Sequence, residues 1–377
     1  MAGIYIHIPF CKKLCYYCDF YHVIARGFDY SEYARTIAAE AELRSDYLDT
    51  ESVKTIYFGG GTPSVFSLKE LEIIMTSIKK TFKTDEICEI TIELNPDDVD
   101  TFFLKGLHAL GFNRISLGVQ SWRDEDLKLM NRRHDSMKAE AALKDCLNTG
   151  FSNVSVDLIY GLPGMSNDAW KSNLEKTFSF EIKHLSAYHL TFEKGTVFGK
   201  MLEKGLISEA DEDLSIAMFN QLEELAERAG FIHYEISNFG KEGYFSLHNT
   251  NYWKQVKYLG LGPSAHSFNG YSRQWNKSDL NSYLRSIKSS VLDFEIEELD
   301  GRTRLNEYIM VSLRTMWGID LGYVETIFGK EGFDYIVNMS SKFREYGLMK
   351  QQADNIVLTS QGKMISDNII SEFMMPE

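Results

Sequence analysis

The chain is poor in proline, with 6 among 377 residues. That scarcity excludes Pro-rich linkers and collagen-like segments. Long apolar runs are missing too, because no stretch approaches the roughly 18 uncharged apolar residues that a transmembrane helix needs. Residues 1–8 contain no basic segment and are typical of a strand, not of a secretory signal. We therefore expect a cytoplasmic protein without an integral membrane segment. Peripheral association with a membrane stays open, although no amphipathic anchor stands out.

The chain has fewer positively charged than negatively charged residues. Lys and Arg number 40 and Asp and Glu 54, which gives a formal net charge of −14. A chain this acidic repels phosphate backbones, so we expect no nucleic-acid partner. Apolar residues make up 44% and charged residues 25%, the proportions of an ordinary globular protein and not of a disordered one. The length favours two or three domains.

Short β-rich runs alternate with longer helical patterns through the first half of the chain. We expect strands at 3–8, 54–58, 88–94, 114–119, 153–159 and 184–190. Helices are expected between them at 30–47, 67–81, 101–110, 136–148 and 167–179. This alternation predicts βαβ units around a parallel sheet. Periodicity alone does not distinguish an open doubly wound sheet from a complete or partial barrel.

The pattern changes in the second half. A helix at 212–229 and a strand at 231–237 are followed by an aromatic-rich, Gly-punctuated stretch without helical period before about residue 280. Helices are then expected at 304–313, 323–328, 333–346 and 363–373, with a short strand at 356–359. We therefore expect a strand–helix domain over 1–240, an aromatic-rich extension over 241–295 and a small, mainly helical domain over 296–377.

Unusual residues follow four of the expected strands. A cysteine run follows the first, a glycine triplet at 59–61 the second, Asn95 and Pro96 the third, and Gln120 the fourth. In both candidate architectures, ligands bind at the carboxyl ends of the strands. We expect these residues to converge on one face of the sheet.

The cysteine run has the spacing C-x3-C-x2-C, formed by Cys11, Cys15 and Cys18. Three thiolates in one loop can bind one metal centre. A zinc site with His7 or His22 as further ligand stays open, as do three packed thiols without a metal. A [4Fe–4S] cluster with one iron left free of protein thiolate suits three cysteines best. The remaining cysteines, Cys88 and Cys146, are expected to be packed thiols.

This spacing, with an aromatic residue before the last cysteine, resembles the radical S-adenosylmethionine (SAM) superfamily. The resemblance implies that the open iron chelates SAM. An electron from the cluster then cleaves SAM to methionine and a 5′-deoxyadenosyl radical. It also implies the fold, an α/β partial (β/α)6 TIM-type barrel with a small, mainly helical C-terminal domain.

A narrower resemblance is to the oxygen-independent coproporphyrinogen III oxidase group. It is carried by the segments 5–11, 59–63, 118–121 and 157–163, with a Gly-rich Ser-Ala turn at 259–266. The resemblance implies a set of SAM contacts: Tyr5, Tyr17, Gly60, Gly61, Thr62, Glu93, Gln120, Arg132 and Asp157. Among these we expect Glu93 to meet the ribose hydroxyls and Arg132 to clamp a carboxylate.

Two branches of that group compete. The oxidase branch, in fact a dehydrogenase that decarboxylates propionates to vinyls, has a further cysteine where this chain has Phe20, and an extension before the first strand. The haem chaperone branch, called HemW-type, carries His-Asn-x-x-Tyr-Trp, which this chain has at 248–253. The resemblance therefore implies haem as cargo, with His248 as axial iron ligand, Tyr252 as the weaker candidate and Trp253 packing on the porphyrin.

The expected function is capture of haem and its transfer to an apo-haemoprotein, for example a respiratory one, without coproporphyrinogen dehydrogenase activity. The expected cofactors are a [4Fe–4S] cluster and SAM, and a reductant for the cluster is an implied partner. The dehydrogenase is the alternative, and a radical SAM enzyme acting on an unrelated small molecule is a third reading. The recipient, the electron donor, productive SAM cleavage and the oligomeric state, a homodimer included, stay open.

Overall fold

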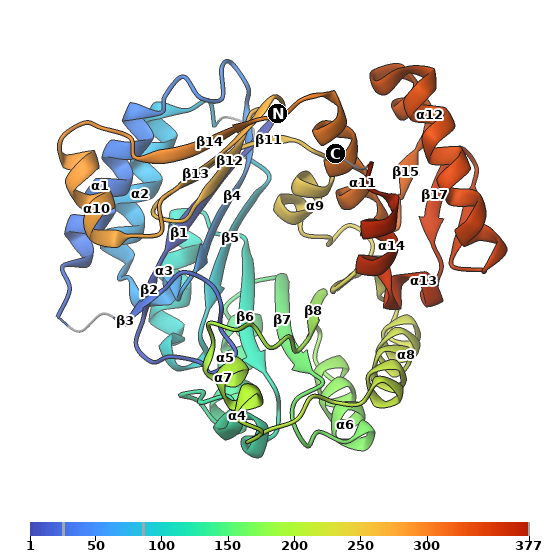
Figure 1. The fold of residues 1–377 in the computed structure, drawn as a ribbon. Coiled ribbons are helices and arrows are strands. Elements are labelled where there is room, and N and C mark those ends of the chain that lie inside the picture. The colour runs from blue at the N-terminus through green and yellow to red at the C-terminus, as the bar shows by residue number, and fades with distance from the viewer. Residues whose placement is uncertain (25–26, 85–86, 376–377) are drawn as a thin grey trace.

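A mixed sheet of twelve strands carries the fold of the computed structural model, which describes residues 1–24, 27–84 and 87–375. Its centre is a curved run of six parallel strands in chain order (Figure 1). They are β1 (Ala2–Ile8), β4 (Val53–Gly60), β5 (Glu89–Leu94), β6 (Arg114–Gln120), β7 (Asn153–Tyr160) and β8 (His184–His189). These six strands match those expected from the sequence to within two residues at each end.

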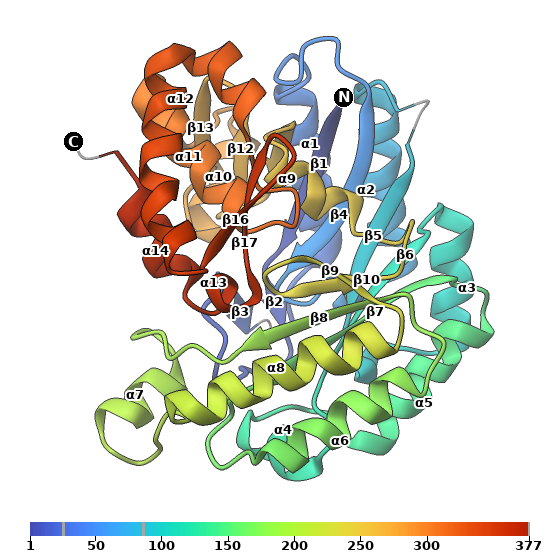
Figure 2. The same cartoon turned by 90° about the vertical axis from the view of Figure 1, so that its right-hand side faces the viewer.

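Helices cover the outer face of this run (Figures 1 and 2). In β1 the outward Ile4, Ile6 and Ile8 are fully buried against them, because alternate strand residues point to opposite faces. The helices between residues 30 and 228 are α1 (Tyr30–Leu43), α2 (Leu68–Thr81), α3 (Thr101–Leu110), α4 (Asp124–Leu129), α5 (Ser136–Asn148), α6 (Asn167–Phe178), α7 (Val197–Glu203) and α8 (Glu212–Arg228). Of these, α7 contacts the cysteine loop, because the Phe198 N–H donates to the Tyr16 carbonyl at 2.9 Å. Short 3-10 turns lie at η1 (Pro63–Val65) and η2 (Pro96–Asp98). The partial α/β barrel expected from the sequence is confirmed.

The sheet continues beyond both ends of the six-strand run. The pair β9 (Ile232–Glu235) and β10 (Asn238–Gly240) extends it past β8. On the other side β11 (Lys257–Leu261) runs parallel to β1 and leads to β12 (His266–Phe268), β13 (Ser272–Asn276) and β14 (Phe294–Glu298). The helices of this region are α9 (Leu247–Trp253) and α10 (Leu280–Lys288). A two-stranded ribbon, β2 (Phe10–Cys11) with β3 (Val23–Ile24), stands apart from the sheet.

The sequence shows no helical period before about residue 280, yet the structure forms the helix α9 there, together with the three strands β11, β12 and β13. These elements are three to seven residues long, too short to show a period. The strand β11 is defined by its pairing with β1. Tertiary contacts therefore determine the secondary structure of this stretch, which the local sequence does not specify.

The C-terminal part has a hydrophobic core of its own. It contains α11 (Gly301–Leu313), α12 (Leu321–Glu345), α13 (Ser360–Met364) and α14 (Ser366–Phe373), with a small sheet of β15 (Ile319–Asp320), β16 (Met349–Gln352) and β17 (Asn355–Leu358). Gly329 interrupts α12 with a φ of 72°, which explains why two helices were expected there. Figure 2 shows α11, α12 and α14 gathered on one side of the sheet, away from α3 and α5. No helix in the described part of the chain could reach across a bilayer as an apolar span.

The inner face of the sheet is polar, and α9 packs on it between the strands and α11 (Figure 1). The carboxylate of Glu89 accepts hydrogen bonds from the backbone N–H groups of Leu247 and His248, at 3.0 and 2.9 Å. The Arg114 guanidinium lies 4.0 Å from the same carboxylate, and both side chains are almost fully buried. One carboxylate therefore satisfies two free N–H groups at the start of a helix and one buried cation.

We expect Glu89→Gln to lower the free energy of unfolding by about 3 kcal/mol, because the substitution leaves the Arg114 charge buried without a counter-charge. Urea unfolding followed by circular dichroism measures this change. Glu72→Gln on the exposed side of α2 is the matched control and should change stability by less than about 0.5 kcal/mol. Equal urea midpoints for Glu89→Gln and Glu72→Gln would contradict the inference that the Glu89 carboxylate stabilises α9 and Arg114.

Candidate functional site

A cavity of about 580 Å³ opens at the carboxyl ends of the parallel strands. This is the face on which the sequence predicts convergence, and the residues expected there do meet. Those lining the cavity are Cys11, Cys15, Tyr17, Cys18, Gly60, Gly61, Thr62, Glu93, Gln120, Arg132 and Asp157. Four other expected site residues do not line it: Tyr5, His248, Tyr252 and Trp253.

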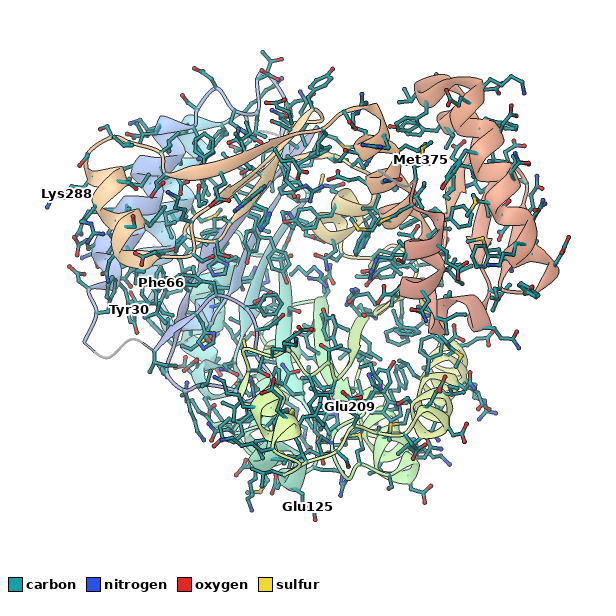
Figure 3. The ribbon with its side chains drawn as sticks, viewed as in Figure 1. Tyr30, Phe66, Glu125, Glu209, Lys288 and Met375 are labelled. Carbon is teal, nitrogen blue, oxygen red and sulfur yellow. The ribbon has the colours of Figure 1, made fainter. Side chains whose placement is uncertain are left out.

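The loop that carries the three cysteines is anchored at its base. The ribbon of β2 and β3 closes it, and the fully buried Phe10 packs on Tyr30 and Phe66 at ring distances of 5.1 and 6.0 Å. Figure 3 shows Tyr30 and Phe66 close together on the α1 side of the molecule. The loop therefore leaves the sheet from a rigid aromatic base.

The Arg132 side chain fixes the cysteine loop over the strand ends. Its guanidinium donates to the Cys15 Sγ at 3.4 Å, to the Tyr17 hydroxyl at 3.3 Å and to the Gly118 carbonyl at 2.8 Å. A fourth hydrogen bond, to the Asn95 side-chain oxygen, ties in the end of β5. Burial opposes its charge, yet the neighbouring Tyr17 and Cys15 raise its pKa. A permanent cation thus lies beside the thiols.

The surroundings of the Cys11 and Cys18 thiols keep them protonated until a metal replaces the proton. Burial raises the pKa of Cys18 to about 12 and also raises that of Cys11, whose Sγ lies 3.4 Å from the Thr62 hydroxyl. At neutral pH these thiols are therefore protonated until a positively charged centre replaces the proton.

The spacing of the side chains favours a cluster over a single ion. Among the residues that the structure describes, no three His, Cys, Asp or Glu side chains lie close enough to hold one metal ion. His7, one of the two extra zinc ligands considered from the sequence, is buried with its Nε2 at 2.9 Å from the Tyr21 carbonyl. Cys11, Cys15 and Cys18 line one cavity. Three thiolates that leave one iron without a protein ligand are a donor set that fits a [4Fe–4S] cluster.

Two glycines form part of the cavity wall because no larger residue fits. Gly60 has a φ of 108°, and a Cβ there would lie 2.6 Å from the His7 ring. A Cβ on Gly61 would lie 2.7 Å from the Pro9 backbone. The backbone itself therefore faces the cavity, with Thr62 beside it.

Two carboxylates line the cavity beyond the glycines. Glu93 accepts from the Tyr57 hydroxyl at 2.8 Å and from the Gly60 N–H at 3.2 Å, and burial raises its pKa to about 7. Asp157 accepts from the Ser116 hydroxyl at 3.0 Å, and burial raises its pKa to about 6. Both are acceptors suited to the hydroxyls of a polar ligand.

Gln120 lines the cavity, and its backbone is strained. Its φ is 67°, a region that non-glycine residues seldom adopt. A Cβ on the neighbouring Gly118 would lie 2.9 Å from the Gln120 side-chain nitrogen. Strain of this kind costs of order 1 kcal/mol and persists where the surroundings hold the residue in place.

The His-Asn-x-x-Tyr-Trp motif forms α9 and lies on the inner face, apart from the cavity. His248 is 2% exposed, with its Nδ1 at 2.9 Å from the Thr55 hydroxyl and its Nε2 at 2.8 Å from the Tyr252 hydroxyl. Burial lowers its pKa to about 3. The Tyr5 ring lies near the His248 ring, with the centroids 6.5 Å apart and the planes tilted by 32°. That His248 ligates haem iron stays a prediction, and it requires α9 to leave this position.

Sequence reasoning missed several residues of the site. Tyr57 on β4 and Ser116 on β6 hold the two carboxylates, which lie on the neighbouring strands β5 and β7. Only the pairing of the strands brings them together. Arg314 and Asp367 reach the cavity from the C-terminal part. Nothing in their local sequence points to it.

Comparison with known proteins adds three findings. Residues 5–176 match the family described as Radical SAM superfamily. The chain is 31% identical over 374 residues to a protein of Lactococcus lactis named heme chaperone HemW, covering 99% of this chain and 97% of that protein. It is 30% identical over 376 residues to a Bacillus subtilis protein of the same name, covering 99% of both.

Among solved structures, the coproporphyrinogen III oxidase HemN of Escherichia coli, described as a radical SAM enzyme, superposes with a TM-score of 0.85. The match covers 99% of this chain and 90% of that one at 22% sequence identity, so it concerns the fold alone.

We expect the triple substitution of Cys11, Cys15 and Cys18 by alanine to abolish the visible absorbance of protein reconstituted anaerobically with iron and sulfide, since no other thiol lines the cavity among the described residues. Cys88 is exposed, so the expectation that it is a packed thiol was wrong, and it lies outside the cavity. Cys88→Ala is therefore the matched control and should keep the full spectrum. Chemical analysis of both variants gives the number of iron and sulfide ions bound per chain. Zinc in place of iron in the wild type would contradict the assignment.

Proposed function

The chain belongs to the radical SAM superfamily and, within it, to the family of the proteins named heme chaperone HemW, and we propose that it binds haem and delivers it to apo-haemoproteins. The observation that carries the proposal is similarity over the whole length: several proteins of that name match 98–99% of this chain at 29–31% identity. The motif at 248–253 is consistent with it.

We further propose which residues hold the cofactors that the superfamily implies. Cys11, Cys15 and Cys18 would hold a [4Fe–4S] cluster. The glycine segment with Thr62 would meet the amino-acid end of SAM, and Glu93 with Asp157 its hydroxyls; Arg132, Gln120 and Tyr17 complete the wall. When bound, the cluster supplies an electron to SAM. Tyr5 would act through His7, since its hydroxyl lies 3.1 Å from the His7 Nδ1 and it does not line the cavity.

Arg132 has a double task in this arrangement. Three of its hydrogen bonds hold the loop and strand ends, and a fourth reaches a cluster cysteine. Its Nε is buried and has no hydrogen-bond partner among the described residues. The guanidinium therefore orients the cysteine loop, and its charge would stabilise a thiolate that binds the cluster.

The alternative is coproporphyrinogen III dehydrogenase, and the likeness to HemN concerns the fold alone. Against it stands position 20, where that branch has a cysteine and this chain places Phe20, 66% exposed on the cavity wall. We expect reduced, reconstituted protein with SAM and coproporphyrinogen III to yield no protoporphyrinogen. Formation of that product would favour the dehydrogenase over the chaperone.

We expect the purified chain to bind haem, seen as a Soret band that saturates on titration, and to pass it to an apo-haemoprotein such as apomyoglobin. The same titration with serum albumin in place of the chain controls for passive release of haem. Transfer faster than from albumin supports the chaperone. Absence of a saturable Soret band would rule the proposal out.

We expect the affinity for SAM to rise with pH through about 7. Burial raises the pKa of Glu93 to about 7, so its carboxylate is protonated below that pH and accepts hydroxyl hydrogen bonds fully only above it. A hydrogen bond to a charged group is worth about 1.5 kcal/mol or more, which corresponds to about tenfold in affinity. Binding of SAM to reconstituted protein between pH 6 and pH 8 measures the slope.

Glu93→Gln should bind SAM more weakly at pH 8 and flatten this dependence, whereas the exposed Glu72→Gln should keep the wild-type profile. The same slope in Glu93→Gln as in the wild type would assign the titration to another group.

A further inference from the structure

The cavity has a second wall that the SAM contacts do not use. Phe20 and His22 follow the cysteine loop, and Arg314 and Asp367 come from the C-terminal part; all four line the cavity. We call these four residues the outer wall. It combines an imidazole, an exposed aromatic ring and a cation, which are the groups that recognise a metalloporphyrin with carboxylate side chains.

His22 has a ring nitrogen free for a metal. Its Nδ1 lies 2.7 Å from the Phe20 carbonyl oxygen, and a carbonyl can only accept, so Nδ1 carries the proton. In the neutral ring Nε2 then holds a lone pair, and among the described residues it has no hydrogen-bond partner. A backbone hydrogen bond at Nδ1 that leaves Nε2 for the metal is the usual arrangement of a ligating histidine.

The other histidines near the site lack this freedom. His189 is the second imidazole on the cavity wall, and its Nε2 lies 3.0 Å from the Ser215 hydroxyl. Both ring nitrogens of His248 are engaged, and the ring is buried away from the cavity. His22 can therefore receive a metal without displacement of a helix.

Phe20 adds an apolar surface to the same cavity wall. Its side chain is 66% exposed, because no described element covers the ring. Such exposure is unusual for a large aromatic side chain. Position 20 lies two residues from both Cys18 and His22 in the sequence. A flat macrocycle bound at His22 would bury this ring and gain the free energy of that contact.

Arg314 supplies a positive charge that a carboxylate could take over. Its guanidinium lies 2.5 Å from the carboxylate of Asp367, which is 77% exposed. Exposed pairs of this kind contribute little to stability, so an incoming carboxylate can replace Asp367. By contrast, the other guanidinium on the wall, Arg132, is committed to the cysteine loop.

We propose that haem docks on the outer wall, with His22 Nε2 as axial ligand of the iron, Phe20 against the macrocycle and Arg314 on a propionate. The proposal rests on the proposed function and gives it a site other than α9. The bond formed is a coordination bond in which the nitrogen lone pair is donated to iron. No proton is released and no redox change is needed, because Nε2 carries no proton.

We expect His22→Ala to shift the Soret maximum and to weaken haem binding at least about tenfold, the loss typical even for weaker perturbations of a metal site. Haem titration by absorbance measures both. His22→Gly with added imidazole should restore the wild-type spectrum, which a merely structural role of His22 would not allow. Iron and sulfide content, unchanged in both variants, excludes loss of the cluster as the cause.

Arg314→Ala should weaken binding about tenfold without moving the Soret maximum, since it removes a bidentate carboxylate partner and no iron ligand. The matched controls are His108→Ala and Arg228→Ala, both exposed and outside the cavity. They should bind haem like the wild type.

The outcomes separate this inference from the proposed function. A wild-type protein that binds haem, with an unchanged spectrum and affinity in His22→Ala and a lost Soret band in His248→Ala, overturns the outer wall and leaves the chaperone intact. A wild-type protein that binds no haem overturns both. Loss of the axial ligand signature in His22→Ala, with His248→Ala and His189→Ala retaining it, supports the assignment.

Discussion

The hydrogen bonds of one guanidinium position the whole site. Arg132 joins the cysteine loop, through Cys15 and Tyr17, to the ends of β5 and β6, through Asn95 and Gly118. These hydrogen bonds hold the loop over the strand ends, because an unpaired buried charge is costly. The position of Cys15 and Tyr17 in the cavity wall follows from that constraint.

A partial barrel leaves its inner face open, and the chain closes it with segments from its second half. Glu89 holds the start of α9 against the sheet, and His248 continues the contact through Thr55. The C-terminal part brings Arg314 and Asp367 to the cavity. These two residues are the ones after position 240 that line the cavity among the described residues. They add a guanidinium and a carboxylate to its wall.

The polar positions that alternate along the strands were predictable as a group, because residues two apart share a face. Their pairing was not. Glu93 pairs with Tyr57 of the neighbouring strand, and Asp157 pairs with Ser116. Such pairs depend on the register of the strands, which the hydrophobic pattern does not specify. His248 is the instructive case: its motif was read from the sequence as a haem ligand, while the fold engages both of its ring nitrogens.

The sequence by itself determined the six parallel strands, the helices that separate them and the three-thiol motif, since each rests on local periodicity or on spacing within one short segment. Only the tertiary structure decided that α9 lies on the inner face, that β11 joins β1, and that His22 and Arg314 line the same cavity. The physical reason is distance along the chain: contacts between residues tens or hundreds of positions apart depend on how the whole sheet curves, and no local pattern encodes that curvature.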